Sequence, residues 1–96
     1  MLTATQIENK IKQVKPLLEQ KYFVSSIGYF GSYSNGTQTE GSDLDVIVEF
    51  RKPLGWAFFD LQLFLESELK CKVDLITSAA IKEQLKSKIL KQVKYI

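Results

Sequence analysis

Apolar positions near the start of the chain recur every three or four residues, a spacing that places them on one face of an α-helix. They are Ile7, Ile11, Val14 and Leu18. Thr5 and Glu8 have the spacing of a capping box, in which each side chain bonds a backbone amide at the helix start. We therefore predict a first helix over about residues 5–20, in which Pro16 either kinks the helix or marks its last turn.

Three later segments have the short apolar patterns that are typical of β-strands. They cover residues 24–30, 44–48 and 72–76. The second segment is rich in β-branched residues, which indicates a buried strand. In the first, Gly28 indicates a close backbone approach or a bulge. In the third, side chains alternate, so Asp74 faces away from its apolar neighbours.

Two more helices are expected in the second half of the chain. Residues 56–69 carry a broad apolar face, on which Trp56 should meet the core or another subunit, while Asp60 and Glu66 face solvent. Ser78 is suited to cap a last helix. The apolar face of that helix repeats every four residues, at Ile81, Leu85, Ile89 and Val93.

Lysines crowd the rest of this last helix. They are Lys82, Lys86, Lys88, Lys91 and Lys94. We expect them to form a solvated face, with contact to an acidic partner or to RNA as the alternative.

Glycines and small polar residues join the first two strands. Gly31 and Ser32 follow the first strand, and we expect a short helical turn from about Ser32 to Gly36. Exposed amides at such a turn bind anions, because unsatisfied N–H groups and the local dipole favour negative charge. Taken alone, the segment is better explained as an ordinary turn.

The order of helix, strand, turn, strand, helix, strand and helix predicts an α/β fold with a small mixed sheet flanked by helices. The 96 residues should form one domain, 1–96. The connection between the first two strands is short, so these strands are either antiparallel or splayed around the turn.

Two acids stand at the start of the second strand. Asp43 and Asp45 alternate with Leu44, so we expect both carboxylates on one face of the strand, roughly 6.6 Å apart along it. Unpaired acids there would cost on the order of several kcal/mol in desolvation and mutual repulsion. A divalent cation, or a pair of cations, removes that conflict.

Composition narrows the chemistry. The absence of histidine excludes a Ser-His-Asp triad, a Cys-His pair and histidine-bearing zinc sites. A metal site must therefore use oxygen ligands, which suits Mg²⁺ or Mn²⁺. The net charge of +2 is too small to argue for direct binding of nucleic acid. The lone Cys71 excludes an internal disulfide and suits the reducing cytoplasm, and no apolar run is long enough to span a membrane.

Six residues between positions 31 and 45 resemble the nucleotidyltransferase signature of the DNA polymerase β superfamily. They are Gly31, Ser32, Gly36, Ser42, Asp43 and Asp45. In a chain this short, the match looks like a minimal nucleotidyltransferase (MNT-type) domain and implies the polymerase β-like nucleotidyltransferase fold. The family has a third carboxylate on a later strand, which Asp74 resembles. It often has Ala-Arg where this chain has Ser34-Asn35, so a candidate phosphate contact is missing.

The resemblance implies metal-dependent transfer of a nucleoside monophosphate, AMP from ATP or its counterpart from another nucleoside triphosphate, to a hydroxyl. Under this hypothesis Gly31 and Ser32 hold the β- and γ-phosphates, Gly36 ends the phosphate turn, and Ser42 orients the loop that carries Asp43.

The same hypothesis assigns the metal site. Asp43 and Asp45 would hold two Mg²⁺ ions, or Mn²⁺ in their place, of which one carries the triphosphate. Asp74 would ligate the other ion and accept or relay the proton of the acceptor hydroxyl.

The resemblance also implies a protein partner, a helical HEPN (higher eukaryotes and prokaryotes nucleotide-binding) protein that is often an RNase toxin. Little chain remains to enclose a small acceptor, so we expect the acceptor to be a Tyr hydroxyl of that partner. Trp56, Phe58, Phe59 and the last helix would supply the docking face.

Two alternatives and one open point accompany this hypothesis. The chain is alternatively an antitoxin-like binding module that neutralises a HEPN-type toxin by occlusion without catalysis, which Asn35 in place of arginine favours. RNA binding by the terminal lysines is a weaker third idea. A homodimer remains open.

Overall fold

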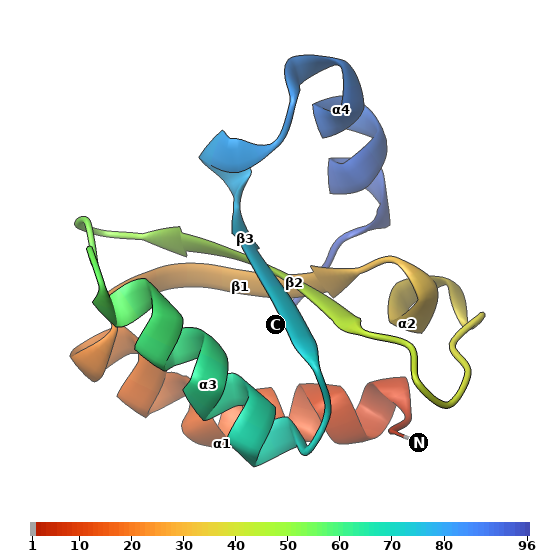
Figure 1. Ribbon diagram of the computed structural model, residues 1–96, viewed down its shortest axis with the longest axis horizontal. Coiled ribbons are helices and arrows are strands. Elements are labelled where there is room, and N and C mark those ends of the chain that lie inside the picture. Colours follow the sequence, from red (N-terminus) through yellow and green to blue (C-terminus); the bar gives the residue numbers. More distant parts are fainter. Residues whose placement is uncertain (1) are drawn as a thin grey trace.

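The computed structural model describes residues 2–96 (Figure 1). Along the chain, its elements are α1 (Ala4–Lys21), β1 (Val24–Phe30), α2 (Ser32–Asn35), β2 (Leu44–Phe50), α3 (Ala57–Leu69), β3 (Val73–Thr77), the 3₁₀ turn η1 (Ser78–Ala80), α4 (Glu83–Gln92) and β4 (Lys94–Tyr95). Within that range, no helix combines the length and the apolar character needed to cross a bilayer.

The strands form one mixed sheet in the order β3-β2-β1-β4. β1 is antiparallel to β2 and to β4, whereas β2 and β3 are parallel, because α3 carries the chain back between them. The predicted α/β class with a small mixed sheet is confirmed. Of the two arrangements left open for the first two strands, the antiparallel one is found.

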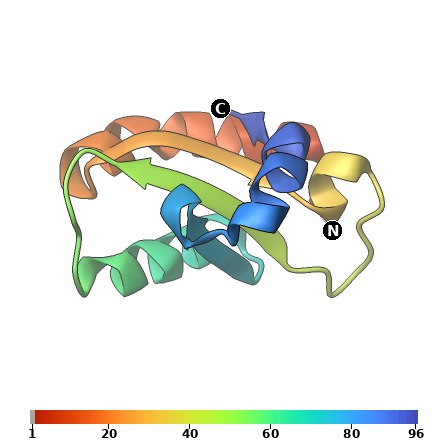
Figure 2. The ribbon, with the colours of Figure 1, turned by 90° about the horizontal axis from the view of Figure 1, so that it is seen from above.

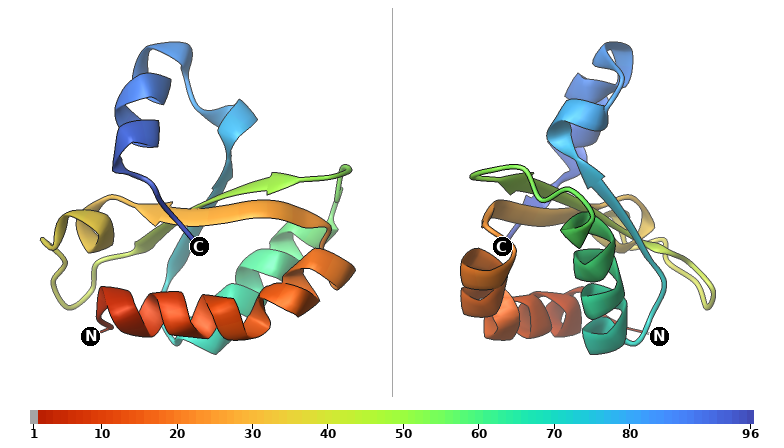
Figure 3. Two further views of the ribbon diagram at one scale, coloured as in Figure 1. Left: turned by 180° about the vertical axis from the view of Figure 1, so that it is seen from behind. Right: turned by 60° about the vertical axis from the view of Figure 1, so that its left-hand side comes forward.

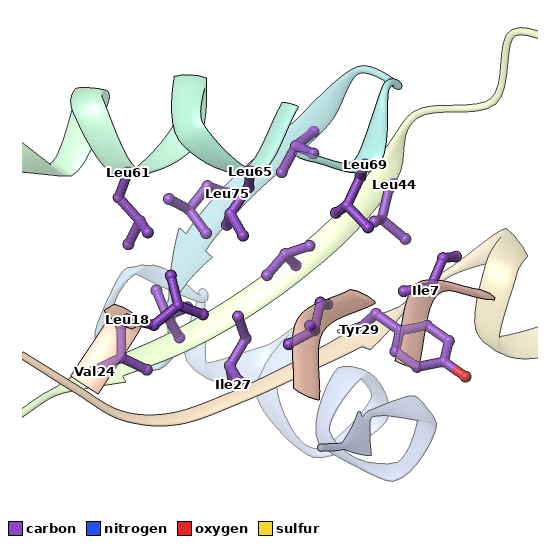
Figure 4. Close-up of a cluster of buried hydrophobic side chains, with 14 of the residues drawn as sticks. Ile7, Leu18, Val24, Ile27, Tyr29, Leu44, Leu61, Leu65, Leu69 and Leu75 are labelled. Atoms are coloured by element: carbon purple, nitrogen blue, oxygen red, sulfur yellow. The ribbon is translucent and has the colours of Figure 1, made fainter. Parts of the chain in front are cut away.

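Helices α1 and α3 cover the same face of the sheet (Figure 1), and they lie apart from each other when the molecule is seen from above (Figure 2). The core between them joins both helices to the strands (Figure 4). Its helical members include Ile7, Ile11, Leu18, Leu61, Leu65 and Leu69. From β2, the alternate residues Leu44, Val46 and Val48 are fully buried against this layer. Because strand side chains alternate, Asp45 points to the opposite face of the sheet.

The start of α1 lies two residues before the predicted capping box. Thr3 is the N-cap: its hydroxyl accepts a bond from the Gln6 amide at 3.1 Å, and the Gln6 side chain accepts one from the Thr3 amide at 2.9 Å. Both threonines satisfy the sequence pattern, so the pattern alone could not choose between them, and the choice of Thr5 was wrong. Pro16 lies inside the helix, which continues to Lys21, so it does not mark the last turn.

Helix α3 buries a single stripe of leucines, and the prediction of its other faces was partly wrong. Trp56 is 85% exposed and Phe59 is 55% exposed, which excludes them from the core. Glu66, expected to face solvent, is half-buried. Its carboxylate accepts a hydrogen bond from the Val73 N–H at 3.0 Å, because it lies on the side of α3 that faces β3.

The segment after β3 departs furthest from expectation. Ser78 lies in η1 and caps no long helix, and α4 begins only at Glu83, without a side-chain cap. Helix α4 stands off the sheet face that α1 and α3 leave open (Figure 3), and none of its residues is buried. Val93 leaves the helix with extended dihedrals, and the chain then pairs with β1 as β4. The four-residue period predicted one continuous helix because local spacing carries no information about the free edge of β1.

Gly28 is the point where β4 and the end of α4 meet β1. A Cβ atom on Gly28 would lie 2.7 Å from Val93 Cγ1 and 2.9 Å from the Lys94 carbonyl oxygen. Next to this contact, the Ile96 N–H donates to the Ile27 carbonyl at 2.9 Å. The close backbone approach predicted for Gly28 is confirmed.

We predict that Gly28→Ala lowers the free energy of unfolding by roughly 1–3 kcal/mol, because an overpacked site must push Val93 and Lys94 away from β1. Denaturant unfolding measures the change. Ser25→Ala, at an exposed position of the same strand, is the control. Equal stability of the two variants would show that β4 does not close on Gly28.

Candidate active site

The predicted site residues gather at one end of the sheet. Gly31 and Ser32 follow β1, Asp43 immediately precedes β2, and Asp45 and Asp74 lie within β2 and β3. Because β1 is antiparallel to β2 and β2 is parallel to β3, the end of β1 lies beside the starts of the other two strands. Residues from three separate segments of the sequence therefore meet at this end.

Asp45 and Asp74 are direct register partners in the parallel ladder of β2 and β3. Neighbouring strands run about 4.8 Å apart, and paired residues point to the same face. Val73 and Leu75 are buried on the helix side, so Asp74, like Asp45, projects from the open face. The structure thus brings together two of the three predicted carboxylates as near neighbours.

The surroundings of Asp45 oppose its negative charge. Burial raises the pKa of the Asp45 carboxyl above its ordinary value, and the charges of Asp74 and then Asp43 raise that pKa further. All three causes act in the same direction. A cation that binds the carboxylate oxygens would remove both the repulsion and part of the desolvation penalty, so the donor set fits a divalent ion such as Mg²⁺.

Asp43 is held less firmly than the alternation argument assumed. β2 begins at Leu44, so Asp43 lies in the preceding loop, and its side chain is exposed. The pKa values of the Asp45 carboxyl and the Cys71 thiol are raised mainly by burial, and the charge of Asp43 raises both further. Asp43 and Cys71 also line the same groove. Within residues 2–96, no three histidine, cysteine, aspartate or glutamate side chains converge into a ready-made metal site. A three-carboxylate site would therefore require Asp43 to turn inward from its loop.

The glycine of the Gly-Ser turn is required by its contact with Asp45. Gly31 has φ 77°, in the left-handed region that L-residues rarely adopt, and a Cβ atom there would overlap Oδ2 of Asp45. The Gly31 carbonyl then accepts bonds from the amides of Ser34 and Asn35, each at 3.0 Å, which closes the turn of α2. As predicted, α2 begins at Ser32 and its C-cap is Gly36, in the left-handed conformation.

Ser42 organises the loop before Asp43. The Thr39 amide donates to the Ser42 hydroxyl at 3.0 Å, and the Ser42 amide donates to the Thr39 carbonyl at 3.0 Å. This reciprocal pair is the kind of contact that the predicted orienting role needs, and it fixes the loop one residue away from Asp43.

Ser34 ties the turn to the C-terminal segment. Its hydroxyl donates to the Gln92 carbonyl at 2.5 Å, at the last residue of α4. Asn35, the position at which the resemblance implied a missing arginine, is exposed. Nothing in the local pattern around Ser34 indicated this long-range contact, since Gln92 lies 58 residues later.

A groove of about 920 Å³ opens beside Asp43. It runs along α1 and is lined by residues from four separate segments, among them Asn9, Tyr33, Ser42, Asp43 and Lys72. Neither Asp45 nor Asp74 lines it. The groove could not be predicted from the sequence, because no single segment carries a pattern for it.

Comparison with known proteins agrees with this arrangement. Residues 11–96 match the family model of the nucleotidyltransferase domain. The chain is 35% identical over 97 residues to the protein adenylyltransferase MntA of Thermococcus cleftensis. The alignment covers 100% of this chain and 98% of the relative. The chain is also 43% identical over 83 residues to a candidate protein adenylyltransferase of Methanocaldococcus jannaschii. That alignment covers 85% of each protein.

Solved structures share the fold. A candidate minimal nucleotidyltransferase superposes with a TM-score of 0.82 at 23% identity, covering 97% of this chain and 95% of that chain. A chain from a toxin-antitoxin crystal structure with AMP-PNP matches with a TM-score of 0.72 at 33% identity. The match covers 91% of this chain and 71% of that chain. A chain from the complex of an MNT antitoxin with a tri-AMPylated HEPN toxin from Shewanella oneidensis matches with a TM-score of 0.66 at 25% identity. The match covers 93% of this chain and 70% of that chain.

The sequence signature, the mixed sheet and the paired acids beside the Gly-Ser turn therefore have one explanation: the chain belongs to the nucleotidyltransferase domain family, and its fold matches that of a minimal nucleotidyltransferase.

Proposed function

We propose that the chain transfers AMP from ATP to a tyrosine hydroxyl of a HEPN-type partner protein. The observation that carries this proposal is the side-by-side placement of Asp45 and Asp74, with the Gly31 backbone directly against the Asp45 carboxylate. Support comes from relatives named as protein adenylyltransferases and from a similar antitoxin in complex with an AMPylated HEPN toxin.

The reaction is a displacement at the α-phosphorus of ATP. The acceptor oxygen forms a bond to that phosphorus, the bond to the oxygen that bridges to the β-phosphorus breaks, and pyrophosphate leaves. The hydroxyl proton passes to a nearby base. In this proposal Asp74 accepts it, because its carboxylate is exposed beside Asp45 and no histidine is present in the chain.

The chain's own residues have two further roles. Backbone amides at Gly31 and Ser32, and the Ser32 hydroxyl, bind and orient the β- and γ-phosphates. Asp43, Asp45 and Asp74 would hold Mg²⁺ or Mn²⁺, and the bound ions would neutralise charge on the triphosphate and on the acceptor oxygen.

The acceptor must come from outside this chain. On the open face of the sheet, from which Asp45 and Asp74 project, only the C-terminal segment with η1 and α4 rises above the strands within residues 2–96 (Figure 3). Nothing in the described chain encloses a small acceptor against the two acids. A partner surface that presents a tyrosine can reach this face directly.

The docking face expected around Trp56 needs revision. Trp56 and Phe59 lie at the start of α3, after the far end of β2, and Phe58 packs on Phe50 at that end. Asp45 precedes Phe50 by five residues of β2, so the two residues lie roughly 17 Å apart along the strand. The aromatic patch therefore cannot adjoin the acceptor hydroxyl, although a large partner could contact both places.

The second candidate is an antitoxin that neutralises its partner by occlusion. Asn35 in place of arginine is the observation that favours it, because one charge-assisted phosphate contact is missing.

The aspartate assignment predicts the outcome of a melting experiment. The raised pKa of Asp45 means that its contribution to stability is full below the ordinary pKa and is lost as pH rises through the raised value. Asp45→Asn should therefore leave the apo protein equally or more stable at neutral pH, while Asp45→Asn and Asp43→Asn each abolish the thermal shift produced by Mg-ATP. Asp60→Asn is the control, since Asp60 is exposed on α3. An unchanged shift in both active-site variants would refute the assignment.

Position 35 predicts a gain of affinity. Asn35→Arg should tighten binding of Mg-ATP by on the order of 1 kcal/mol or more, because it supplies a charged donor to the phosphates. Titration calorimetry measures this, with Asn35→Gln as the uncharged control. Equal or weaker affinity of the arginine variant would mean that α2 does not face the triphosphate.

The acceptor prediction uses intact masses. The purified chain is incubated with ATP, Mg²⁺ and a helical HEPN-type protein, taken from a neighbouring reading frame if one encodes it, and the intact mass of each protein is measured. We expect a partner heavier by one or more adenylyl groups, and no modification with Asp45→Asn. An unmodified partner held in a stable complex would favour occlusion, and the absence of both complex and modification would refute both candidates.

A further inference from the structure

The outer edge of β3 is held by two side chains of α3. The Val73 N–H donates to Glu66 Oε2 at 3.0 Å, and the Val73 carbonyl accepts a bond from Gln62 Nε2 at 3.0 Å. Gln62 and Glu66 lie four residues apart, on the same side of α3. We call these two bonds the Val73 clamp.

Val73 is the residue of β3 where such a clamp has an effect. β3 is an edge strand of the sheet. The Leu44 amide donates to the Lys72 carbonyl at 2.8 Å, so the backbone groups of Lys72 point toward β2. Because these directions alternate along a strand, those of Val73 point outward, where no further strand exists to pair with them. The clamp supplies both missing partners.

Repulsion between Asp74 and Asp45 destabilises the position of β3 at this edge of the sheet. Asp74 follows Val73 directly, and its register partner on β2 is Asp45. Two carboxylates side by side repel, which pushes β3 away from β2. Parallel pairing is the weaker kind of strand pairing, and β3 has only five residues. The strand therefore needs support from its other side.

Helix α3 is a firm support for the clamp. Leu61, Leu65 and Leu69 are buried in the core, which anchors the helix beside the edge strand. The connection from α3 to β3 is short, because Lys70 turns the chain in the left-handed conformation immediately after Leu69.

We propose that Gln62 and Glu66 are positioning residues, which hold Asp74 beside Asp45 by fixing the outer edge of β3. The catalytic part of this inference rests on the proposed function, in which Asp74 receives the acceptor proton. The structural part, that the clamp sets the register and spacing of β3, stands without it.

The apo protein tests the structural part. The variants are Glu66→Ala, Gln62→Ala and the conservative Glu66→Gln, which keeps an acceptor oxygen. Glu68→Ala is the matched control, because Glu68 belongs to the same helix but its carboxylate lies 3.8 Å from Lys10 Nζ instead of at β3. NMR measures amide hydrogen exchange at Val73 and cross-strand proton contacts between Asp45 and Asp74.

We expect Glu66→Ala to speed exchange at Val73 at least about tenfold and to weaken the Asp45–Asp74 contacts, because the amide loses its acceptor and the edge moves. Gln62→Ala should weaken the same contacts. Glu66→Gln and Glu68→Ala should resemble the original protein. Unchanged exchange at Val73 in Glu66→Ala would overturn the clamp, and fast exchange with unchanged Asp45–Asp74 contacts would overturn the positioning role.

Kinetics of partner adenylylation tests the catalytic part. Since a misplacement of about 1 Å can cost about 100-fold in rate, Glu66→Ala should lower kcat by roughly 10- to 100-fold with the KM for ATP nearly unchanged, and Glu66→Gln should restore kcat. Loss of binding in place of turnover, or no rescue by glutamine, would contradict the proposal. If the original protein transfers no adenylyl group, the proposed function fails, and the NMR comparison still decides whether the clamp holds Asp74.

Discussion

Asp45 and Asp74 repel each other at the open face of the sheet, and the elements around them hold the two acids side by side. The two carboxylates share a rung of the parallel ladder, and burial adds to the penalty at Asp45. Such a pair persists because the surrounding structure over-determines it: β2 is central in the sheet and α3 is anchored in the core. The two negative charges destabilise the protein without a metal ion, and the same charges favour the binding of cations. This binding is what the proposed chemistry uses.

Patterns with a local cause predicted much of the fold. The alternation of Leu44 and Asp45 predicted that Asp45 points away from Leu44, and the structure buries Leu44 against the helices. The first strand was predicted with its observed bounds, and Gly28 marks the close approach that it indicated. The C-terminal segment was mispredicted because its cause is not local: Val93 leaves α4 to let β4 pair with β1, and only the assembled sheet offers that edge.

The site was predictable in its residue types more than in its supports. Spacing in the sequence selected Gly31, Asp43 and Asp45 as candidates, yet it placed Asp43 on the strand, whereas β2 begins one residue later. Glu66 was expected in solvent because charge on a helix usually faces water, and its bond to Val73 spans an α3–β3 contact that no periodicity encodes. The overlap between a Cβ atom at Gly31 and Asp45 likewise appears only when β1 and β2 are paired.

We propose that Asp45, Asp74 and the Gly31-Ser32 backbone form one metal–nucleotide site. Paramagnetic line broadening by Mn²⁺ in the presence of a non-hydrolysable ATP analogue tests it most directly, because Mn²⁺ broadens only the signals near it. If these residues form one site, the amide signals of Gly31, Ser32, Asp45 and Asp74 should broaden first. They should recover when excess Mg²⁺ displaces the Mn²⁺. Broadening centred elsewhere, or none at these four amides, would contradict it.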